Sequence, residues 1–111
     1  MAARYVLTKT SNGQFRFVLK AGNGETLLTS ETYTAKANAT AGIESVKTNA
    51  PIDARYDRKN ASNNKPMFNL KSGNGQVIGT SEQYSSTAAR DEGIEAVKKN
   101  GPGASTNDQT G

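Results

Sequence analysis

Apolar and polar side chains alternate along residues 15–20, which is the pattern of a β-strand with one buried face. One face carries Phe15, Phe17 and Leu19, and the other carries Arg16, Val18 and Lys20. Gly22-Asn23-Gly24 comes next, and both residue types tolerate a positive φ. The pattern therefore predicts a tight hairpin that returns as a second strand over residues 25–31.

Two further elements flank this hairpin. Residues 4–10 are predicted to form a strand, joined to the alternating segment through the turn residues 11–13. After Tyr33 the apolar spacing becomes helical, with Ala39, Ile43 and Val46 on one face. Each unit is therefore predicted to be strand–strand–strand–helix.

The whole unit is written twice in the chain. Residues 4–51 align with residues 55–102 without a gap, and 22 of the 48 pairs are identical. Two copies are too few for a solenoid, which usually needs three or more. A pair of copies more often closes on itself around a pseudo-twofold axis, as a homodimer does.

Neither copy has enough apolar side chains to bury a stable core by itself. We therefore predict a single domain over residues 1–102, built from the repeats 4–51 and 55–102, which pool their apolar residues. The tail, residues 103–111, has no aliphatic side chain larger than Ala, and we predict that it is disordered. The pooled core is predicted to contain Phe17, Leu19, Leu27, Ile43, Val46, Phe68, Leu70, Ile78, Ile94 and Val97.

The ends and middles of the helices carry their own signals. Thr34 and Ser85 are predicted to cap the N-termini, since their hydroxyls can accept unpaired backbone N–H groups. The prolines at 51 and 102 end the helices because proline cannot continue them. Gly42 and Gly93 sit on the buried stripe, and we expect a close approach of helix to sheet there.

The paired motifs "F-x-L-K-[AS]-G-N-G" and "T-S-E-x-Y", with "G-I-E-[SA]-V-K-x-N" downstream, resemble those of the YegP-like family of small bacterial proteins. The resemblance covers nearly the whole chain except the tail. It implies an α+β fold in which a β3-α-β motif occurs twice and forms a pseudo-twofold intramolecular dimer with a shared antiparallel sheet, two helices and exchanged terminal strands. The resemblance carries no established biochemical activity.

Composition narrows the possible chemistry. The chain has no His and no Cys, so it has no imidazole base, no thiol nucleophile and no Ser/His/Asp triad. We expect no cofactor and no metal site. The sequence has no signal-type apolar segment and no stretch near the ~18 apolar residues of a membrane span, so we expect a cytoplasmic protein with no membrane partner.

Basic residues form the main candidate site. The net charge is +4, and the Lys and Arg residues are scattered along the chain. If the helices cover one sheet face, the other face would carry a twofold-related basic strip that could bind nucleic acid or another polyanion. The alternative is that these groups only keep the protein soluble and protect its strand edges. The candidate residues are Arg16, Lys20, Asn69 and Lys71.

Two other residue pairs could have either a functional or a purely structural role. A pseudo-twofold axis could bring Glu31 and Glu82 together for carboxylate chemistry, whereas the plainer interpretation is a pair of solvated or lysine-paired carboxylates at strand ends. Tyr33 and Tyr84 could stack on a nucleobase, but we favour a role in packing the helices against the sheet.

These observations predict a non-enzymatic protein that acts by binding. An unknown protein or polyanionic partner is favoured over a buried small molecule, because the core has little apolar volume for a pocket. Weak nucleic-acid binding through the basic sheet face is the alternative function. Since both repeats are present in one chain, we expect a monomer.

Overall fold

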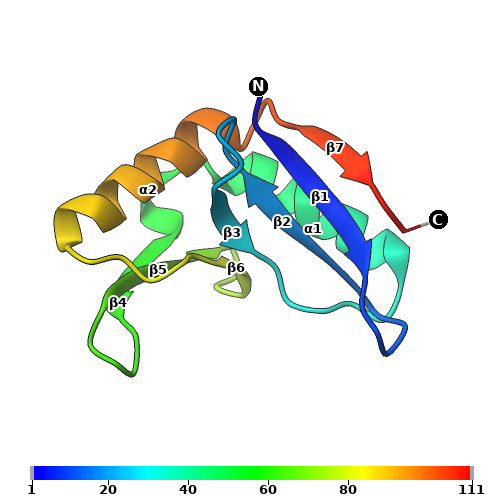
Figure 1. Cartoon of the computed structure of the whole chain (residues 1–111), viewed down its shortest axis with the longest axis horizontal. Coiled ribbons are helices and arrows are strands. Elements are labelled where there is room, and N and C mark those ends of the chain that lie inside the picture. Colours follow the sequence, from blue (N-terminus) through cyan, green and yellow to red (C-terminus); the bar gives the residue numbers. More distant parts are fainter. Residues whose placement is uncertain (1, 111) are drawn as a thin grey trace.

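The computed structural model describes residues 2–110 and shows one mixed sheet of seven strands with two helices (Figure 1). A short 3-10 turn, η1 (Asp53–Arg55), connects the two repeats. The first repeat contains β1 (Arg4–Lys9), β2 (Phe15–Lys20), β3 (Thr26–Thr29) and α1 (Lys36–Asn49). The second contains β4 (Tyr56–Asn60), β5 (Pro66–Lys71), β6 (Val77–Thr80), α2 (Thr87–Asn100) and β7 (Ser105–Asp108).

The strand order is β4-β5-β6-β3-β2-β1-β7 (Figure 1). Strands β4–β6 of the second repeat and β1–β3 of the first form the two halves, and β7 of the second repeat crosses to the far edge beside β1. The α+β class and the repeated unit are confirmed. The hairpins predicted at Gly-Asn-Gly are also present, and Gly24 and Gly75 both have a positive φ, at 87° and 86°. The sheet differs from an antiparallel one at a single pair, since β7 runs parallel to β1.

The prediction of a disordered tail is wrong for residues 105–108, which form β7. Its backbone pairs with β1 from Arg4 to Leu7, and Lys36 of α1 forms a 2.5 Å ion pair with Asp108. Every side chain of β7 is exposed, so the strand depends on backbone hydrogen bonds to a free sheet edge. Side-chain patterning carries no signal for such a strand. Gly111 lies outside the described residues.

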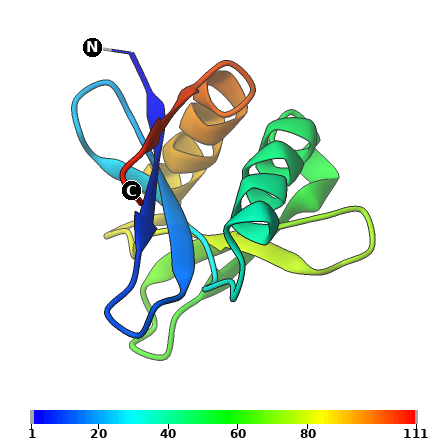
Figure 2. The same cartoon turned by 90° about the vertical axis from the view of Figure 1, so that its right-hand side faces the viewer.

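The two halves of the sheet meet where β3 pairs with β6, a contact we call the seam. The pair there is Thr29 with Thr80, antiparallel, and these residues are 51 apart. Equivalent residues that pair antiparallel place a pseudo-twofold axis between them. Both helices lie on the same side of the sheet and pack across the seam, α1 on β2, β5 and β6, and α2 on β5 and β3 (Figure 2).

The seam has room for only one large side chain. Leu28 is fully buried, and its equivalent in the second repeat is Gly79. A Cβ at Gly79 would lie 2.5 Å from the Leu28 Cγ and Cδ2 atoms. A second leucine would therefore occupy the same volume as the first, and the second repeat makes room by having no side chain there.

A reciprocal pair of hydrogen bonds ties each repeat to the other. The hydroxyl of Tyr5 in the first repeat donates to the carbonyl oxygen of Gly101 after α2, at 2.7 Å. The hydroxyl of Tyr56 in the second repeat donates to the carbonyl oxygen of Ala50 after α1, also at 2.7 Å. Each tyrosine thus satisfies a carbonyl group at a helix C-terminus of the opposite repeat, where carbonyls lack intrahelical partners.

The tyrosines that precede the helices fill the space above the helical glycines. Tyr33 stacks on Phe17 with ring centroids 6.4 Å apart, and Tyr84 stacks on Phe68 at the same distance. A Cβ at Gly93 would lie 2.3 Å from the Tyr84 hydroxyl, and Gly42 meets the Tyr33 hydroxyl in the same way. We had expected the helices to approach the sheet closely at these glycines. The nearest group at both is a tyrosine hydroxyl, and at Gly42 the ring of Phe17 in β2 also comes within 3.0 Å of the added Cβ.

The predicted N-caps are displaced by one residue. Ser86, and not Ser85, caps α2, and its side-chain oxygen accepts from the backbone N–H of Ala89 at 3.1 Å. In α1 the equivalent position is Ala35, which has no side-chain oxygen, so Thr34 does not cap that helix. Adjacent hydroxyl residues left the position of the cap ambiguous in the sequence.

Exchange of the two seam residues tests the shared core. Gly79→Leu should lower the free energy of unfolding by about 1–3 kcal/mol, because two leucines then compete for one volume. Adding Leu28→Gly to that variant should restore most of the loss, since one large side chain again fills the seam. Urea denaturation measures both values. If Leu28→Gly instead lowers the free energy of unfolding further in the Gly79→Leu background, the two side chains do not share one volume.

The tyrosine caps predict a loss of stability in alkali. Burial, and secondarily the charges of Glu44 and Glu95, raise the pKa of Tyr5 and Tyr56 above the usual value. The unfolded chain then loses these protons above pH of about 10 while the folded chain keeps them, so stability falls as pH rises, by up to about 1.4 kcal/mol per pH unit for each group.

Tyr5→Phe/Tyr56→Phe should therefore be less stable at pH 7, by about 1 kcal/mol per lost hydrogen bond. Above the unfolded pKa, its stability should also fall less steeply with pH than that of the wild type. Urea denaturation at a series of alkaline pH values measures both effects. An unchanged slope would show that other groups cause the alkaline loss.

Candidate binding surface

One face of the sheet is left uncovered by the helices in the described part of the chain. We call it the uncovered face; it carries the strand residues that alternate with the buried core. In β1 and β2 the register pairs Arg4 with Lys20 and Thr8 with Arg16 on this face. Val6 pairs with Val18 between them, and the opposite face carries Tyr5, Leu7, Phe17 and Leu19 of the core.

The second repeat continues this face across the seam. Asp57 pairs with Asn69, and Lys59 pairs with Met67. Asn69 accepts a hydrogen bond from the Thr80 hydroxyl at 2.9 Å, next to the seam. The centre of the face is therefore made of small neutral side chains, and most of its charged side chains lie toward the strand ends.

All four predicted binding residues lie on the uncovered face. Arg16 is exposed, whereas Lys20, Asn69 and Lys71 are half-buried. They do not form one cluster: two belong to β2 and two to β5, with β3 and β6 between them. Three strand spacings correspond to about 14 Å, so the structure gives two basic groups on one surface.

The sequence reasoning missed two further cations, Arg4 and Lys59, which lie on the same face. Arg4 alternates with the core residue Tyr5 in β1, and Lys59 alternates with Arg58 in β4. The period-2 pattern of these two strands therefore contained the signal. The Nη1 atom of Arg4 is buried and has no hydrogen-bond partner among the described residues.

Charge on the strands of the uncovered face is mostly positive. The only carboxylate among its described strand residues is Asp57, which lies 3.6 Å from the Lys71 Nζ atom. Carboxylates instead pair on the helix side: hydrogen bonds from Lys98 and Arg58 lower the pKa of Asp53 to about 2. The cations of the uncovered face are Arg4, Arg16, Lys20, Lys59 and Lys71.

The uncovered face has no aromatic side chain among the described residues. Tyr5, Phe17, Tyr56 and Phe68 belong to the core, and Phe15, Tyr33 and Tyr84 pack against it. The predicted packing of Tyr33 and Tyr84 against the core is confirmed. Contacts from this face to a ligand would come from cations, hydroxyls and amides.

The carboxylates of Glu31 and Glu82 are not brought together. Each lies two residues beyond the Thr29–Thr80 pair, and because the strands are antiparallel the two chains leave the seam in opposite directions. Both residues are exposed, and neither forms an ion pair among the described residues. The arrangement does not form the close carboxylate pair that we considered.

The repeated Thr-Ser-Glu motif instead serves the fold through its serine. The Ser30 hydroxyl accepts from the backbone N–H of Phe17 at 2.9 Å and donates to the carbonyl oxygen of Glu31 at 2.7 Å. Ser81 makes the same two bonds with Phe68 and Glu82, at the same distances. A buried hydroxyl that satisfies two backbone groups explains why the motif recurs.

The described part of the chain also lacks two other kinds of feature. Residues 2–110 contain no group of three or more carboxylates that could hold a metal ion. None of the helices in this described range has the length and apolar character needed to cross a membrane.

Comparison with known proteins places the chain among close relatives. The family described as "Domain of unknown function (DUF1508)" matches residues 10–57 and again residues 61–108. A UPF0339 protein of Acinetobacter baylyi is 57% identical over 111 residues, covering 100% of both chains.

Two solution NMR structures have the same fold. The chain is 60% identical to a UPF0339 protein from Shewanella oneidensis, covering 99% of this chain and 93% of that one, with a TM-score of 0.92. It is 53% identical to yegP from E. coli, a protein of unknown function, covering 100% and 96%, with a TM-score of 0.93.

Proposed function

The chain belongs to the DUF1508 family of UPF0339 proteins, and we propose that it is a non-enzymatic binding module that recognises a polyanionic partner through its uncovered face. The observation that carries the proposal is that both repeats place cations on one face, with a single carboxylate among its described strand residues. A helix-free sheet face of this kind offers a broad surface and not a deep pocket.

The chemistry of the face favours a phosphate-rich partner. Lys and Arg contact phosphate oxygens irrespective of sequence, and threonine hydroxyls and asparagine amides add hydrogen bonds to a backbone. Because stacking of bases needs aromatic side chains, their absence from the described part of this face favours contacts with the phosphate backbone. The proposed recognition is therefore independent of nucleic-acid sequence.

The proposed working unit is a single chain. The seam joins the two basic groups inside one molecule, so both reach a partner without association of a second copy. An acidic protein surface is the other partner that this charge pattern suits, and it is distinguished by the experiment below.

Fluorescence anisotropy with labelled DNA and RNA, single- and double-stranded, tests the proposal over a salt series. The logarithm of the binding constant should fall linearly with the logarithm of the salt concentration. Lys20→Glu/Lys71→Glu should bind more weakly, and its slope on duplex DNA should be smaller by about 2, one for each lost phosphate contact.

The matched control reverses the same number of charges away from the uncovered face. Lys9 and Lys99 are exposed and belong to the other side of the molecule, so Lys9→Glu/Lys99→Glu should keep the wild-type slope. If both variants weaken binding equally, the loss comes from the change in net charge and not from the uncovered face. No binding of any nucleic acid at low salt would exclude this partner class in favour of acidic proteins.

A further inference from the structure

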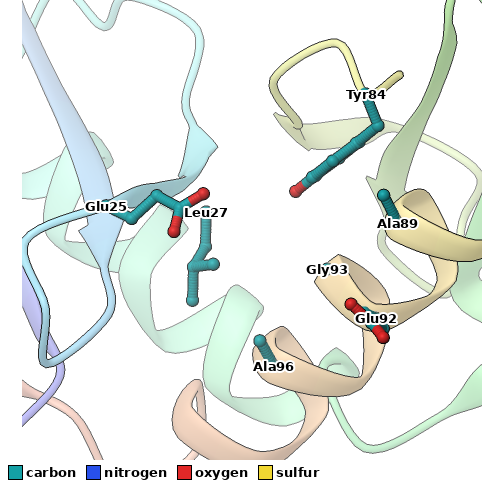
Figure 3. A pocket seen from close by; sticks show the side chains of 7 residues that line it. All are labelled: Glu25, Leu27, Tyr84, Ala89, Glu92, Gly93 and Ala96. Carbon is teal, nitrogen blue, oxygen red and sulfur yellow. The ribbon is translucent and has the colours of Figure 1, made fainter. Parts of the chain in front are cut away.

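A cleft of 240 Å³ lies between the first repeat and α2 of the second repeat, on the helix side of the sheet (Figure 3). Glu25 lines it from the hairpin that leads into β3, and Leu27 lines it from β3 itself. Tyr84 and Glu92 line it from the second repeat, together with the backbone of Gly93. The cleft is thus formed only when the two repeats pack together.

The polar groups of the cleft are largely unpartnered within the described part of the chain, where the Glu25 carboxylate accepts one long hydrogen bond, at 3.4 Å, from the side-chain amide of Asn23. Figure 3 shows the Tyr84 hydroxyl directed into the space between the two repeats. None of the described residues forms a hydrogen bond with it, whereas the hydroxyls of Tyr5 and Tyr56 are both bonded. The ion pairs among residues 2–110 include neither Glu25 nor Glu92, although the protein is basic.

The remaining lining is apolar and narrow. Leu27 is buried, and Ala89 and Ala96 of α2 are half-buried. A volume of 240 Å³ is below the roughly 300–1,000 Å³ of drug-sized ligand sites, so the cleft suits a short chain. Its walls would hold methylene groups, while the two carboxylates and the hydroxyl oxygen would accept hydrogen bonds.

We propose that this cleft binds an alkylammonium group, with the ammonium between Glu25, Glu92 and the Tyr84 hydroxyl and the methylene chain against Leu27, Ala89 and Ala96. An ammonium has three N–H donors and no acceptor, which matches three oxygen acceptors. Bonds from a cation to carboxylates are charge-assisted and stronger than neutral ones. The group can belong to a free amine or to a lysine side chain of a partner.

The electrostatics of Tyr84 agree with this geometry. Burial raises the pKa of its hydroxyl, and the negative charge of Glu25 raises it further, ahead of Glu82. The hydroxyl therefore stays protonated and neutral at physiological pH, with lone pairs free to accept from an ammonium.

The internal repeat supplies a natural comparison. The positions equivalent to Glu25 and Glu92 are Gln76 and Ala41, beside Tyr33. The equivalent place in the other half therefore keeps the tyrosine and lacks both carboxylates. We therefore expect ammonium groups to bind only at the cleft lined by Glu25 and Glu92.

NMR titration of the full-length protein with n-butylamine at pH 7 tests the site. Amide signals of Leu27, Gly93 and their neighbours should shift and saturate, and neutral n-butanol should not reproduce the effect. Glu25→Gln/Glu92→Gln should weaken binding at least about tenfold, through loss of two charge-assisted bonds. Glu31→Gln/Glu44→Gln removes the same charge elsewhere and should bind as the wild type does.

A gain of binding provides the converse test. Gln76→Glu/Ala41→Glu should create a second site, seen as new shifts around Gly42. A lysine-containing tripeptide with blocked ends distinguishes the sources: tighter binding than butylamine indicates a protein ligand, and equal binding indicates a free amine. Absence of shifts at the cleft, or shifts that persist in Glu25→Gln/Glu92→Gln, would overturn the proposal.

Discussion

The packing of Leu28 against Gly79 at the seam is the constraint on which the rest of the structure depends. Near a twofold axis, equivalent side chains meet, and two leucines would need the same space. One repeat fills the volume and the other leaves it empty, so β3 and β6 can pair. That pairing in turn allows each helix to lie across both halves, and Tyr5 and Tyr56 to cap the helix of the opposite repeat.

The same arrangement separates two kinds of surface. Pairing of the halves in one sheet presents the basic strand residues of both repeats on the uncovered face, where Asp57 is the only strand carboxylate described. Packing of the helices on the other face creates the acidic cleft between β3 and α2. The two proposed sites thus differ in charge. The cleft also breaks the symmetry of the repeats, because Glu25 and Glu92 have no acidic equivalents.

Sequence reasoning found those features that rest on side-chain periodicity. The repeat, the hairpins, the helices and the face of Arg16 and Lys20 all follow from it. Periodicity missed β7, which only the family resemblance implied, because the pairing of exposed Ser105–Asp108 uses backbone groups that any sequence has. It also missed the role of Ser30, whose buried hydroxyl joins two segments through hydrogen bonds. The Glu31–Glu82 pair that it considered as an alternative is prevented by strand direction.

Chemical-shift mapping of the isotope-labelled protein with a short DNA duplex at low salt tests the central claim most directly, that the two halves present one binding surface. The account predicts shifts for amides of β1 and β2 and, at the same duplex concentrations, for amides of β5, with α1 and α2 unaffected. Shifts confined to one repeat, or to the helices, would contradict a joint surface on the uncovered face.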